Sequence, residues 1–500
     1  MLRSDYRSPL TAIKGRLAMA TAQSPLATPP ARTAESWKGL FDTVYECDKV
    51  VSDIEGQLPK GLVGTLYRNG PGTHDWTESF FDGDGMIRAI RIGEDGSVRY
   101  QAKYVETEKY RKERAANKQL YRLAGTNRPG GMLANMFRPP AHEANTSVIH
   151  MADRIWALEE GGHPYEMDPE TMTTGEMTDF GGKLHARTAF SAHPHFDPDT
   201  GDCFGFGMHF GAKQALKLFR VDPSARLHHI GEIPISGAGF VHDYALSKQW
   251  MAFFIPPMIP SMSKILFGTG TFFNSLNWEP ERGLKIVLMR RSGGEPIYLE
   301  DEACLAGHVI GAHDVGGELI VDLCRQPEWK CMGEPAANFR TSDWAGYGLG
   351  GVCRYRIDPA AGTVKKEELC ELPAEFPRID SRREGVGARY GYFAANTRAG
   401  EGGWFRGVLK LDMETGATDL FDHGETKAAH ESVFVPRPAS AGGTGEEDDG
   451  WLIGFVHDGL KSETDVAIID ARRVADGPVC TLRLRENAGI TFHGTWVPAA

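Results

Sequence analysis

Short apolar runs, each ended by a turn, dominate the chain from about Trp37 onward. One turn signature recurs, in which an apolar residue precedes Asp and then Pro or Met, and some copies carry Gly a few positions later. Asp bonds the nearby backbone and Gly adopts positive φ, so both favour tight hairpins. The copies lie at Asp168, at Asp197 with Gly201, at Asp222, at Asp358 with Gly362, and at Asp412 with Gly416.

Each copy follows a strand-like run, as in residues 350–357 and 408–411. Strand–hairpin–strand units repeated over about 450 residues predict an all-β fold, with a seven-bladed β-propeller at roughly 60–70 residues per blade as the main expectation. Two packed β domains are the alternative. We expect one domain over residues 37–500, preceded by an extension, residues 1–36, that is flexible or amphipathic; a transit peptide stays open for it.

Two apolar segments interrupt this pattern, at residues 130–140 and residues 251–280. Pro256, Pro257 and Pro260 predict loops in the second segment, and Lys264 argues against a membrane span. The segments are either loops that cover a core, or the wall of an apolar tunnel or a patch that contacts lipid. The candidate tunnel residues are Met132, Phe137, Phe253, Phe254, Met258, Ile259 and Phe267.

Charge and cysteine content narrow the class of protein. The net charge is −12 and no long Lys/Arg cluster occurs, so nucleic acid is not an expected partner. The eight cysteines are dispersed, which favours reduced, buried thiols and an intracellular protein, cytoplasmic or peripherally attached to a membrane. Motifs typical of P-loop NTPases and of α/β-hydrolases are absent. The oligomeric state stays open.

Four of the 17 histidines stand out by their local context, because each lies beside a turn or an apolar run. They are His193, His242, His308 and His493. Imidazoles suit iron, zinc and copper, and such a site requires carboxylates that accept the other ring N–H. Glu160, Glu375 and Glu431 occupy apolar or turn contexts that suit this role. From spacing alone, hydrogen-bonded strand-end histidines and ordinary strand-end carboxylates without a metal are the favoured interpretation.

Several short stretches together resemble the carotenoid cleavage oxygenase family from about residue 45 to the C-terminus. They are Tyr67-Arg-Asn-Gly-Pro71, Phe81-Asp-Gly-Asp-Gly-Met86, Ser191-Ala-His-Pro194, Phe240-Val-His-Asp243, Glu375-Phe-Pro-Arg378, Val433-Phe-Val-Pro-Arg437 and Phe492-His-Gly-Thr-Trp496. Residues 130–135 and 274–282 are most similar to the bacterial apocarotenoid-cleaving branch.

The resemblance implies a seven-bladed propeller with a helical and loop-built dome over one face. It implies one iron(II), held by His193, His242, His308 and His493, with Glu160, Glu375 and Glu431 bonded to the histidines. The implied activity is cleavage of a carbon–carbon double bond in a carotenoid or apocarotenoid by O2, with 15,15′ cleavage to retinal as one outcome. A long apolar polyene is the implied substrate, and peripheral membrane contact agrees with it.

This chain departs from the family in two places. The family's His-x-x-Asn-Ala-aromatic-Glu is here His308-Val-Ile-Gly-Ala-His-Asp314, which leaves His313 as an alternative ligand. The stilbene-cleaving branch has Lys immediately before its glutamate, and this chain has Glu159 there. A stilbene or phenylpropanoid alkene is therefore the second expectation for the substrate. A propeller that binds or isomerises an apolar ligand without oxidation is the third.

Overall fold

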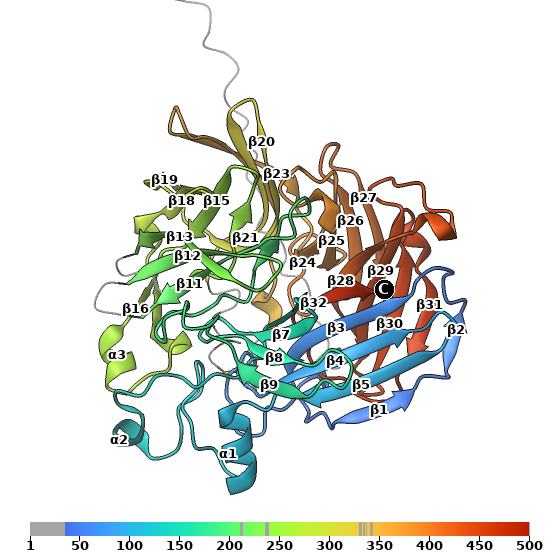
Figure 1. The fold of residues 1–500 in the computed structure, drawn as a ribbon, viewed down its shortest axis with the longest axis horizontal. Helices are drawn as coiled ribbons and strands as arrows, with labels where there is room; N and C mark the ends of the chain where they lie inside the picture. Colours follow the sequence, from blue (N-terminus) through green and yellow to red (C-terminus); the bar gives the residue numbers. More distant parts are fainter. Residues whose placement is uncertain are drawn as a thin grey trace, which may run out of the picture. The chain divides into compact units, whose positions relative to one another are not determined.

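The computed structural model describes residues 36–499, apart from residues 211–213, 236–239, 330–332, 334–335, 337 and 341–343. Residues 31–500 form one compact unit. The predicted extension at residues 1–36 lies outside the described residues except for Ser36. Seven antiparallel sheets follow one another around a central axis, and they form the predicted seven-bladed β-propeller (Figure 1).

From its inner to its outer strand, the first blade consists of β32 (Gly494–Pro498), β3 (Gly64–Pro71), β4 (Gly85–Ile92), β5 (Val98–Tyr104) and β1 (Cys47–Val50). The second blade consists of β6 (Ser147–Met151), β7 (Arg154–Leu158), β8 (Tyr165–Met167) and β9 (Thr174–Met177). The third blade consists of β10 (His195–Phe196), β11 (Cys203–His209), β12 (Ala215–Val221) and β13 (Leu227–Pro234).

The other four blades have the same antiparallel order. The fourth blade consists of β14 (Ala245–Leu246), β15 (Trp250–Ile255), β18 (Leu284–Arg290) and β19 (Ile297–Asp301), and the fifth of β20 (Leu305–Val315), β21 (Glu318–Gln326), β22 (Gly351–Asp358) and β23 (Thr363–Cys370). The sixth blade consists of β24 (Ala374–Arg378), β25 (Tyr390–Ala395), β26 (Gly407–Asp412) and β27 (Thr418–Asp422). The seventh consists of β28 (Lys427–Pro436), β29 (Gly450–Asp458), β30 (Glu463–Asp470), β31 (Pro478–Arg483) and β2 (Ile54–Gly56).

Strands from both ends of the chain close the ring. β32 pairs with β3 and supplies the inner strand of the first blade. β2 pairs with β31 and supplies the outer strand of the last blade. Because both pairings join residues more than 400 positions apart, the ring is complete only when both are made.

The recurring Asp turns are hairpins, as predicted. Asp168 and Asp222 directly follow the third strand of a blade, and Asp358 and Asp412 are the last residues of such a strand. Each side chain accepts hydrogen bonds from backbone N–H groups two or more residues on. Asp197 does the same between the first and second strands of its blade. Gly362 and Gly416 have φ of 68° and 75°, the left-handed region that these turns require.

Hydrophobic clusters lie between neighbouring blades, so the core is distributed around the ring. One cluster joins the third and fourth blades and includes Phe253, and another joins the fourth and fifth and includes Phe254. Both residues belong to β15, whose six residues are all buried. The prediction that Phe253 and Phe254 line a tunnel is therefore wrong, because a fully buried blade strand has the same apolar run as a tunnel loop.

Two segments outside the blades contact each other. One contains α1 (Glu108–Ala116) and α2 (Gly131–Asn135). The other runs through β16 (Met258–Pro260), α3 (Met262–Leu266), η1 (Phe273–Ser275), β17 (Leu276–Trp278) and η2 (Pro280–Arg282). The two contact each other where Phe137 N–H donates to the Leu266 carbonyl and Phe272 N–H to the Ala124 carbonyl.

The other short 3-10 helices are η3 (Trp344–Gly346), η4 (Ser381–Arg383), η5 (Ala439–Ala441) and η6 (Val474–Asp476). Within the described ranges, no helix has the length and apolar character needed to cross a membrane.

Candidate metal centre

The four predicted histidines meet on the propeller axis. One ring nitrogen of each lies within 4.8 Å of those of the other three. His242 Nε2 is 3.0 Å from His308 Nε2, which is 3.2 Å from His493 Nε2. The His193 ring centroid lies 4.3 Å from that of His242 and 4.5 Å from that of His493. His313, the alternative to His308, is not in this group.

Every blade contributes one residue to the centre. His493 lies directly before the inner strand β32, and His193 and His242 lie shortly before the inner strands β10 and β14. His308 lies within the inner strand β20. The three remaining blades supply the predicted glutamates: Glu160 after β7, Glu375 in β24 and Glu431 in β28. The ring therefore brings together side chains that are up to 333 positions apart.

β-bulges position three of these side chains. The strand register shifts between Ala306 and Val309 around His308, between Glu375 and Arg378, and between Ala429 and Ser432 around Glu431. A bulge turns a side chain out of the regular alternation of a strand. In each of these inner strands it directs the functional side chain towards the axis.

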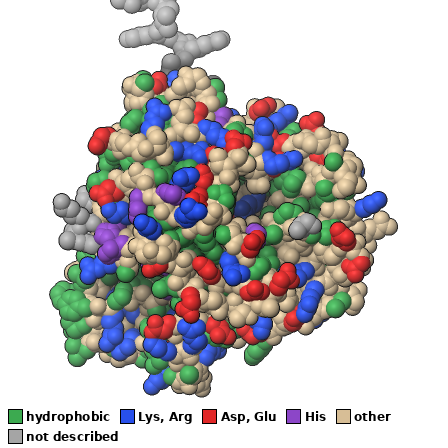
Figure 2. All heavy atoms as spheres, viewed as in Figure 1, with side chains coloured by type: hydrophobic (Ala, Val, Ile, Leu, Met, Phe, Trp, Pro, Cys, Tyr) green, Lys and Arg blue, Asp and Glu red, His purple; other side chains and the backbone are tan. Residues whose placement is uncertain are grey.

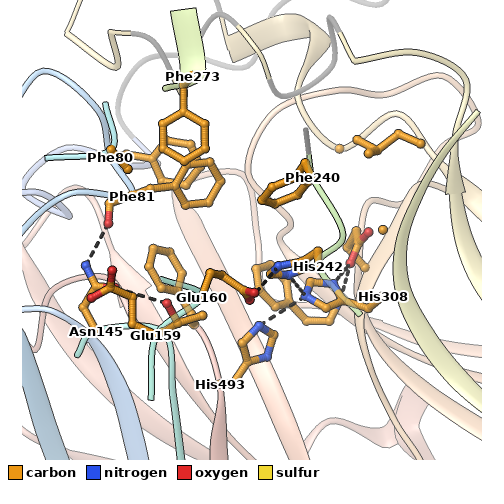
Figure 3. Close-up of a pocket in the computed structure, with 18 of the residues that line it drawn as sticks. Phe80, Phe81, Asn145, Glu159, Glu160, Phe240, His242, Phe273, His308 and His493 are labelled. Atoms are coloured by element: carbon orange, nitrogen blue, oxygen red, sulfur yellow. Dashed lines mark hydrogen bonds and ion pairs between the residues drawn. The ribbon is translucent and has the colours of Figure 1, made fainter. Parts of the chain in front are cut away.

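Each glutamate pairs with a histidine. Glu375 Oε2 lies 2.5 Å from His308 Nδ1, Glu431 Oε1 lies 3.0 Å from His493 Nδ1, and Glu160 Oε1 lies 3.0 Å from His242 Nδ1. Figure 3 shows Glu160 beside His242, with His308 and His493 turned towards the same point. A carboxylate at Nδ1 holds the proton there and leaves the lone pair on Nε2.

This donor set fits a metal cation. Uncharged Nε2 atoms that face one another at 3.0 and 3.2 Å present lone pairs to each other, an arrangement that a cation among them stabilises. His193 Nε2 is buried and has no hydrogen-bond partner in the described part of the chain. The four histidines therefore form a group that could hold a metal ion.

The pKa values of His193 and His493 favour neutral imidazoles, whereas the pKa of His308 is shifted in the opposite direction. Burial, together with the neighbouring histidines, holds the pKa of His193 well below its ordinary value. Burial also lowers the pKa of His493 to about 4, against the opposing effect of Glu431. Burial would lower the pKa of His308 as well, but the adjacent Glu375 carboxylate raises it overall.

Two arginines that sequence analysis did not single out hold Glu431. Arg68 is fully buried and donates to Glu431 Oε2, and Arg378 Nε lies 2.9 Å from Glu431 Oε1. Burial would raise the pKa of Glu431, but the two guanidinium groups hold it well below its usual range. Both arginines lie in the motif stretches quoted above, so their position beside functional residues was the available signal.

An apolar cavity of about 130 Å³, measured as the space open to the centre of a water-sized sphere, borders His242, His308 and His493. Figure 3 shows Phe80, Phe81 and Phe273 along one side of it and Phe240 near His242. Its other aromatic lining residues are Tyr347, Phe376, Phe405 and Phe492. Phe240, Phe376 and Phe492 lie within two residues of a predicted site residue, a signal that sequence analysis did not use.

The predicted tunnel residues do not line this cavity. Met132, Phe137 and Phe267 are 48%, 65% and 49% exposed on the two segments outside the blades. Met258 is buried against Phe273 and Ile259 is half-buried in β16. Apolar character alone does not distinguish a cavity wall from an outer surface.

Phe376 adopts a left-handed backbone conformation, with φ of 53°. Its ring centroid lies 5.4 Å from that of His308 and 5.6 Å from that of His493. Its N–H donates to Glu375 Oε2. Bulky residues avoid this conformation, so the surrounding contacts hold Phe376 in a strained geometry that fixes Glu375 as well.

A propeller whose blades direct four histidines to one axial point, under an aromatic cavity, defines a metalloprotein with an enclosed apolar pocket. Residues 40–498 match the family described as retinal pigment epithelial membrane protein. The chain belongs to this family, which contains the carotenoid cleavage oxygenases.

Individual relatives and solved structures support this family assignment. The chain is 31% identical to apocarotenoid-15,15′-oxygenase of Synechocystis, over 94% of this chain and 98% of that protein. It is also 31% identical to isoeugenol monooxygenase of Pseudomonas nitroreducens, over 92% and 97%. The crystal structure of cobalt-substituted Synechocystis apocarotenoid oxygenase superposes with a TM-score of 0.86 at 31% identity, covering 93% of this chain and 98% of the other.

Proposed function

We propose that the four histidines hold one iron(II). The candidate ligand atoms are nitrogens of neutral imidazoles. Among the described residues, a carboxylate contacts at most one nitrogen of each ring, so the other nitrogen stays available. Such donors suit a divalent first-row metal. The cobalt-substituted relative, whose fold matches this one, supports such a metal. When bound, iron(II) supplies the activation of O2.

Metal analysis of purified variants tests this proposal. We expect one iron per chain in the wild type and loss of iron in His242→Ala and in His493→Ala. His313→Ala is the matched control, because His313 lies in the same strand as His308 but outside the group. Full iron occupancy in either ligand variant would contradict the assignment.

We propose that the reaction is cleavage of a carbon–carbon double bond in an apocarotenoid. One alkene and one O2 yield two carbonyl products, so no further reductant is required. The observation that carries this proposal is the aromatic cavity directly beside the histidines, which suits a conjugated chain. The similarity to apocarotenoid-15,15′-oxygenase supports it.

The chain's own residues bind and orient in this scheme. The phenylalanines contact the polyene and exclude water, so the reacting bond lies in a medium of low polarity. Glu160, Glu375 and Glu431 hold the histidine rings in one tautomer and orientation. Arg68 and Arg378 keep Glu431 ionised, which strengthens its hydrogen bond from His493.

Product identification decides the substrate and the bond. Iron-loaded protein is incubated with apocarotenals of graded length under isotopically labelled O2, and the products are identified by mass spectrometry. We expect two aldehydes or ketones per substrate, and retinal if the 15,15′ bond is cut. Recovery of unchanged or only isomerised substrate from iron-loaded protein would reject cleavage.

A phenylpropanoid or stilbene alkene is the second candidate, and the similarity to isoeugenol monooxygenase favours it. At the position where a lysine is expected in the stilbene-cleaving branch, Glu159 Oε2 instead lies 2.8 Å from His142 Nδ1 and accepts from Ala144 N–H. Burial would raise the pKa of Glu159, but His142 and these bonds lower it. Parallel incubation with isoeugenol and a hydroxystilbene separates the two candidates.

We also propose that α2 and α3 touch a membrane surface. Figure 2 shows hydrophobic side chains gathered at the lower left, where Figure 1 places α3. The Phe137 and Phe267 rings contact each other at a centroid distance of 5.9 Å, which joins the two segments into one patch. Its exposed members are Met132, Leu133, Phe137, Met262, Leu266 and Phe267. An exposed patch of this kind suits a lipid surface.

Co-sedimentation with liposomes tests the patch. We expect wild-type protein to sediment with the vesicles and the double variant Phe137→Glu, Phe267→Glu to stay in the supernatant. Tyr298→Glu is the control, because Tyr298 is 54% exposed in β19, away from α2 and α3. Equal sedimentation of the double variant and the wild type would contradict the assignment.

A further inference from the structure

In the part of the cavity wall away from the histidines and Glu160, one buried carboxamide oxygen has no hydrogen-bond partner among the described residues. Most polar lining residues are bonded within the protein: Asp82 accepts from Thr126, Glu143 accepts from Gly83 N–H, and Asn145 donates to carbonyl groups. Gln326 differs, since it lines the cavity, is 1% exposed, and its Oε1 has no hydrogen-bond partner among the described residues.

Burial of an unpaired carboxamide costs free energy, and buried polar side chains in folded proteins are nearly always bonded. Oxygen and nitrogen of an amide are assigned from their surroundings, but either orientation leaves this group with unused hydrogen-bonding capacity. A cavity ligand that bonds Gln326 would remove the cost.

The backbone makes room for this carboxamide. A Cβ added at Gly350 would lie 2.5 Å from the Arg325 carbonyl oxygen, 2.7 Å from Cδ of Gln326 and 2.8 Å from its Nε2. Gly350 does not have positive φ, so close approach rather than backbone conformation requires glycine there. Glycine at position 350 therefore leaves space for both the β21 backbone and the Gln326 carboxamide.

Gln326 ends β21 and pairs with Leu305 of β20. Leu305 lies three residues before His308 in that strand, which corresponds to on the order of 10 Å. A group that bonds Gln326 is therefore separated from the metal centre by several bonds of a substrate chain, and both lie along the same wall.

We propose that Gln326 is a specificity-determining residue that binds a hydroxyl group of the substrate, remote from the bond that is cut. A hydroxyl both donates and accepts, which matches the two functions of a carboxamide. This inference rests on the proposed function, because the ligand is the alkene substrate. A hydrocarbon analogue leaves Gln326 unpaired and binds more weakly.

The test compares two apocarotenals that differ only in one ring hydroxyl. With iron-loaded wild type we expect kcat/KM to be about 10–100-fold higher for the hydroxylated substrate. In Gln326→Met, which keeps length and volume, we expect this ratio to fall to near 1, through a higher KM for the hydroxylated substrate. Gln249→Met, at an exposed site in another blade, should keep the wild-type ratio.

Gln326→Leu is the second variant, and it removes the carboxamide with a branched apolar side chain in place of the flexible methionine. We expect the same loss of preference in Gln326→Leu as in Gln326→Met. This variant keeps the test valid if Gln326→Met does not fold. A preference that survives in the folded variants would overturn the assignment, and so would a wild type without preference.

Binding to zinc-loaded protein separates this inference from the proposed reaction. Quenching of tryptophan fluorescence gives Kd for both ligands without turnover. If the hydroxylated ligand binds more tightly and Gln326→Met loses the difference, the inference holds even where iron-loaded protein cleaves neither ligand. If both ligands are cleaved and bind alike, the inference fails and the proposed function stands. If neither ligand binds, both fail.

Discussion

At the scale of single residues, the charge on Glu431 is the strongest feature of the centre. The carboxylate accepts from His493 Nδ1 and from two arginines, and all four groups are fixed by these bonds. Loss of its charge would weaken the bond to His493 and leave two guanidinium groups with less compensation. Glu431 therefore links the orientation of the His493 ring to the positions of Arg68 and Arg378.

Replacement of Glu431 by Gln should lower metal affinity or activity about 10–100-fold, because a neutral amide orients His493 less firmly. Competition with a chelator of known affinity measures the change. Glu414→Gln is the control, because the Glu414 side chain is 67% exposed. Wild-type affinity in Glu431→Gln would show that the carboxylate is only structural.

At this scale, the sequence predicts some residues of the site and not others. The four histidines and three glutamates could be found because each lies in a short motif with a recognisable neighbour. Gln326 could not, because nothing in a strand sequence distinguishes a bonded glutamine from an unbonded one. Its significance depends on Gly350, which is 24 positions away in sequence and in contact in the fold.

At the scale of elements, the Asp turns serve more than the hairpins that contain them. Asp197 accepts from Lys248 Nζ at 2.7 Å and from Arg291 at 2.6 Å, and both partners belong to the next blade. The turn was predicted from local sequence, but the contact between blades was not, because its partners lie 51 and 94 positions away. The local sequence therefore predicts the turn, but it does not predict which residues of the next blade contact the Asp197 side chain.

Asp197→Asn should destabilise the protein in a pH-dependent manner. Burial would raise the pKa of Asp197, but Lys248 and Arg291 lower it from 3.8 to about 2. Because the folded-state pKa is depressed, the stabilisation is present above about pH 4 and is lost as the pH falls towards 2. We expect Asp197→Asn to lower the unfolding free energy by about 1–3 kcal/mol at pH 6 and by less at pH 3.

Urea unfolding at a series of pH values measures this effect. Asp199→Asn is the control, since Asp199 also contacts Lys248 but is 74% exposed. A destabilisation of Asp197→Asn that does not change between pH 6 and pH 3 would show that charge is not the cause.

The second element that sequence analysis misread is β15. Its run Met251–Ile255 continues into a proline-rich segment, so both were predicted to be loops that either cover a core or form the wall of an apolar tunnel or a lipid-contacting patch. A strand buried on both faces has no polar alternation, and only the following prolines mark where the blade ends. The segment from Met258 to Trp278 does leave the blade, in agreement with the prolines.

At the scale of the whole molecule, length and turn spacing predicted a seven-bladed propeller, and the family resemblance implied the same number of blades. Neither could show which blade bears which site residue. The structure gives one residue per blade, four histidines and three glutamates, so the centre depends on the closed ring rather than on any one blade.

Removal of residues 494–500 should abolish cooperative unfolding, because it deletes β32 and exposes the edge of β3. Removal of residues 499–500 alone should leave the unfolding transition unchanged. Thermal melts followed by circular dichroism distinguish the two truncations. A sharp transition in the longer truncation would show that the ring closes without β32.

The position of His493 directly before β32 has a consequence for biosynthesis. A ribosome releases the chain from its N-terminal end, so six blades and three of the ligands are outside before the first blade receives its inner strand. The group of four histidines cannot assemble until Pro498 has left the exit tunnel and β32 has paired with β3. The four-histidine group therefore forms only after the strands that carry its other three members have been synthesised, and a translation product interrupted before His493 lacks one member.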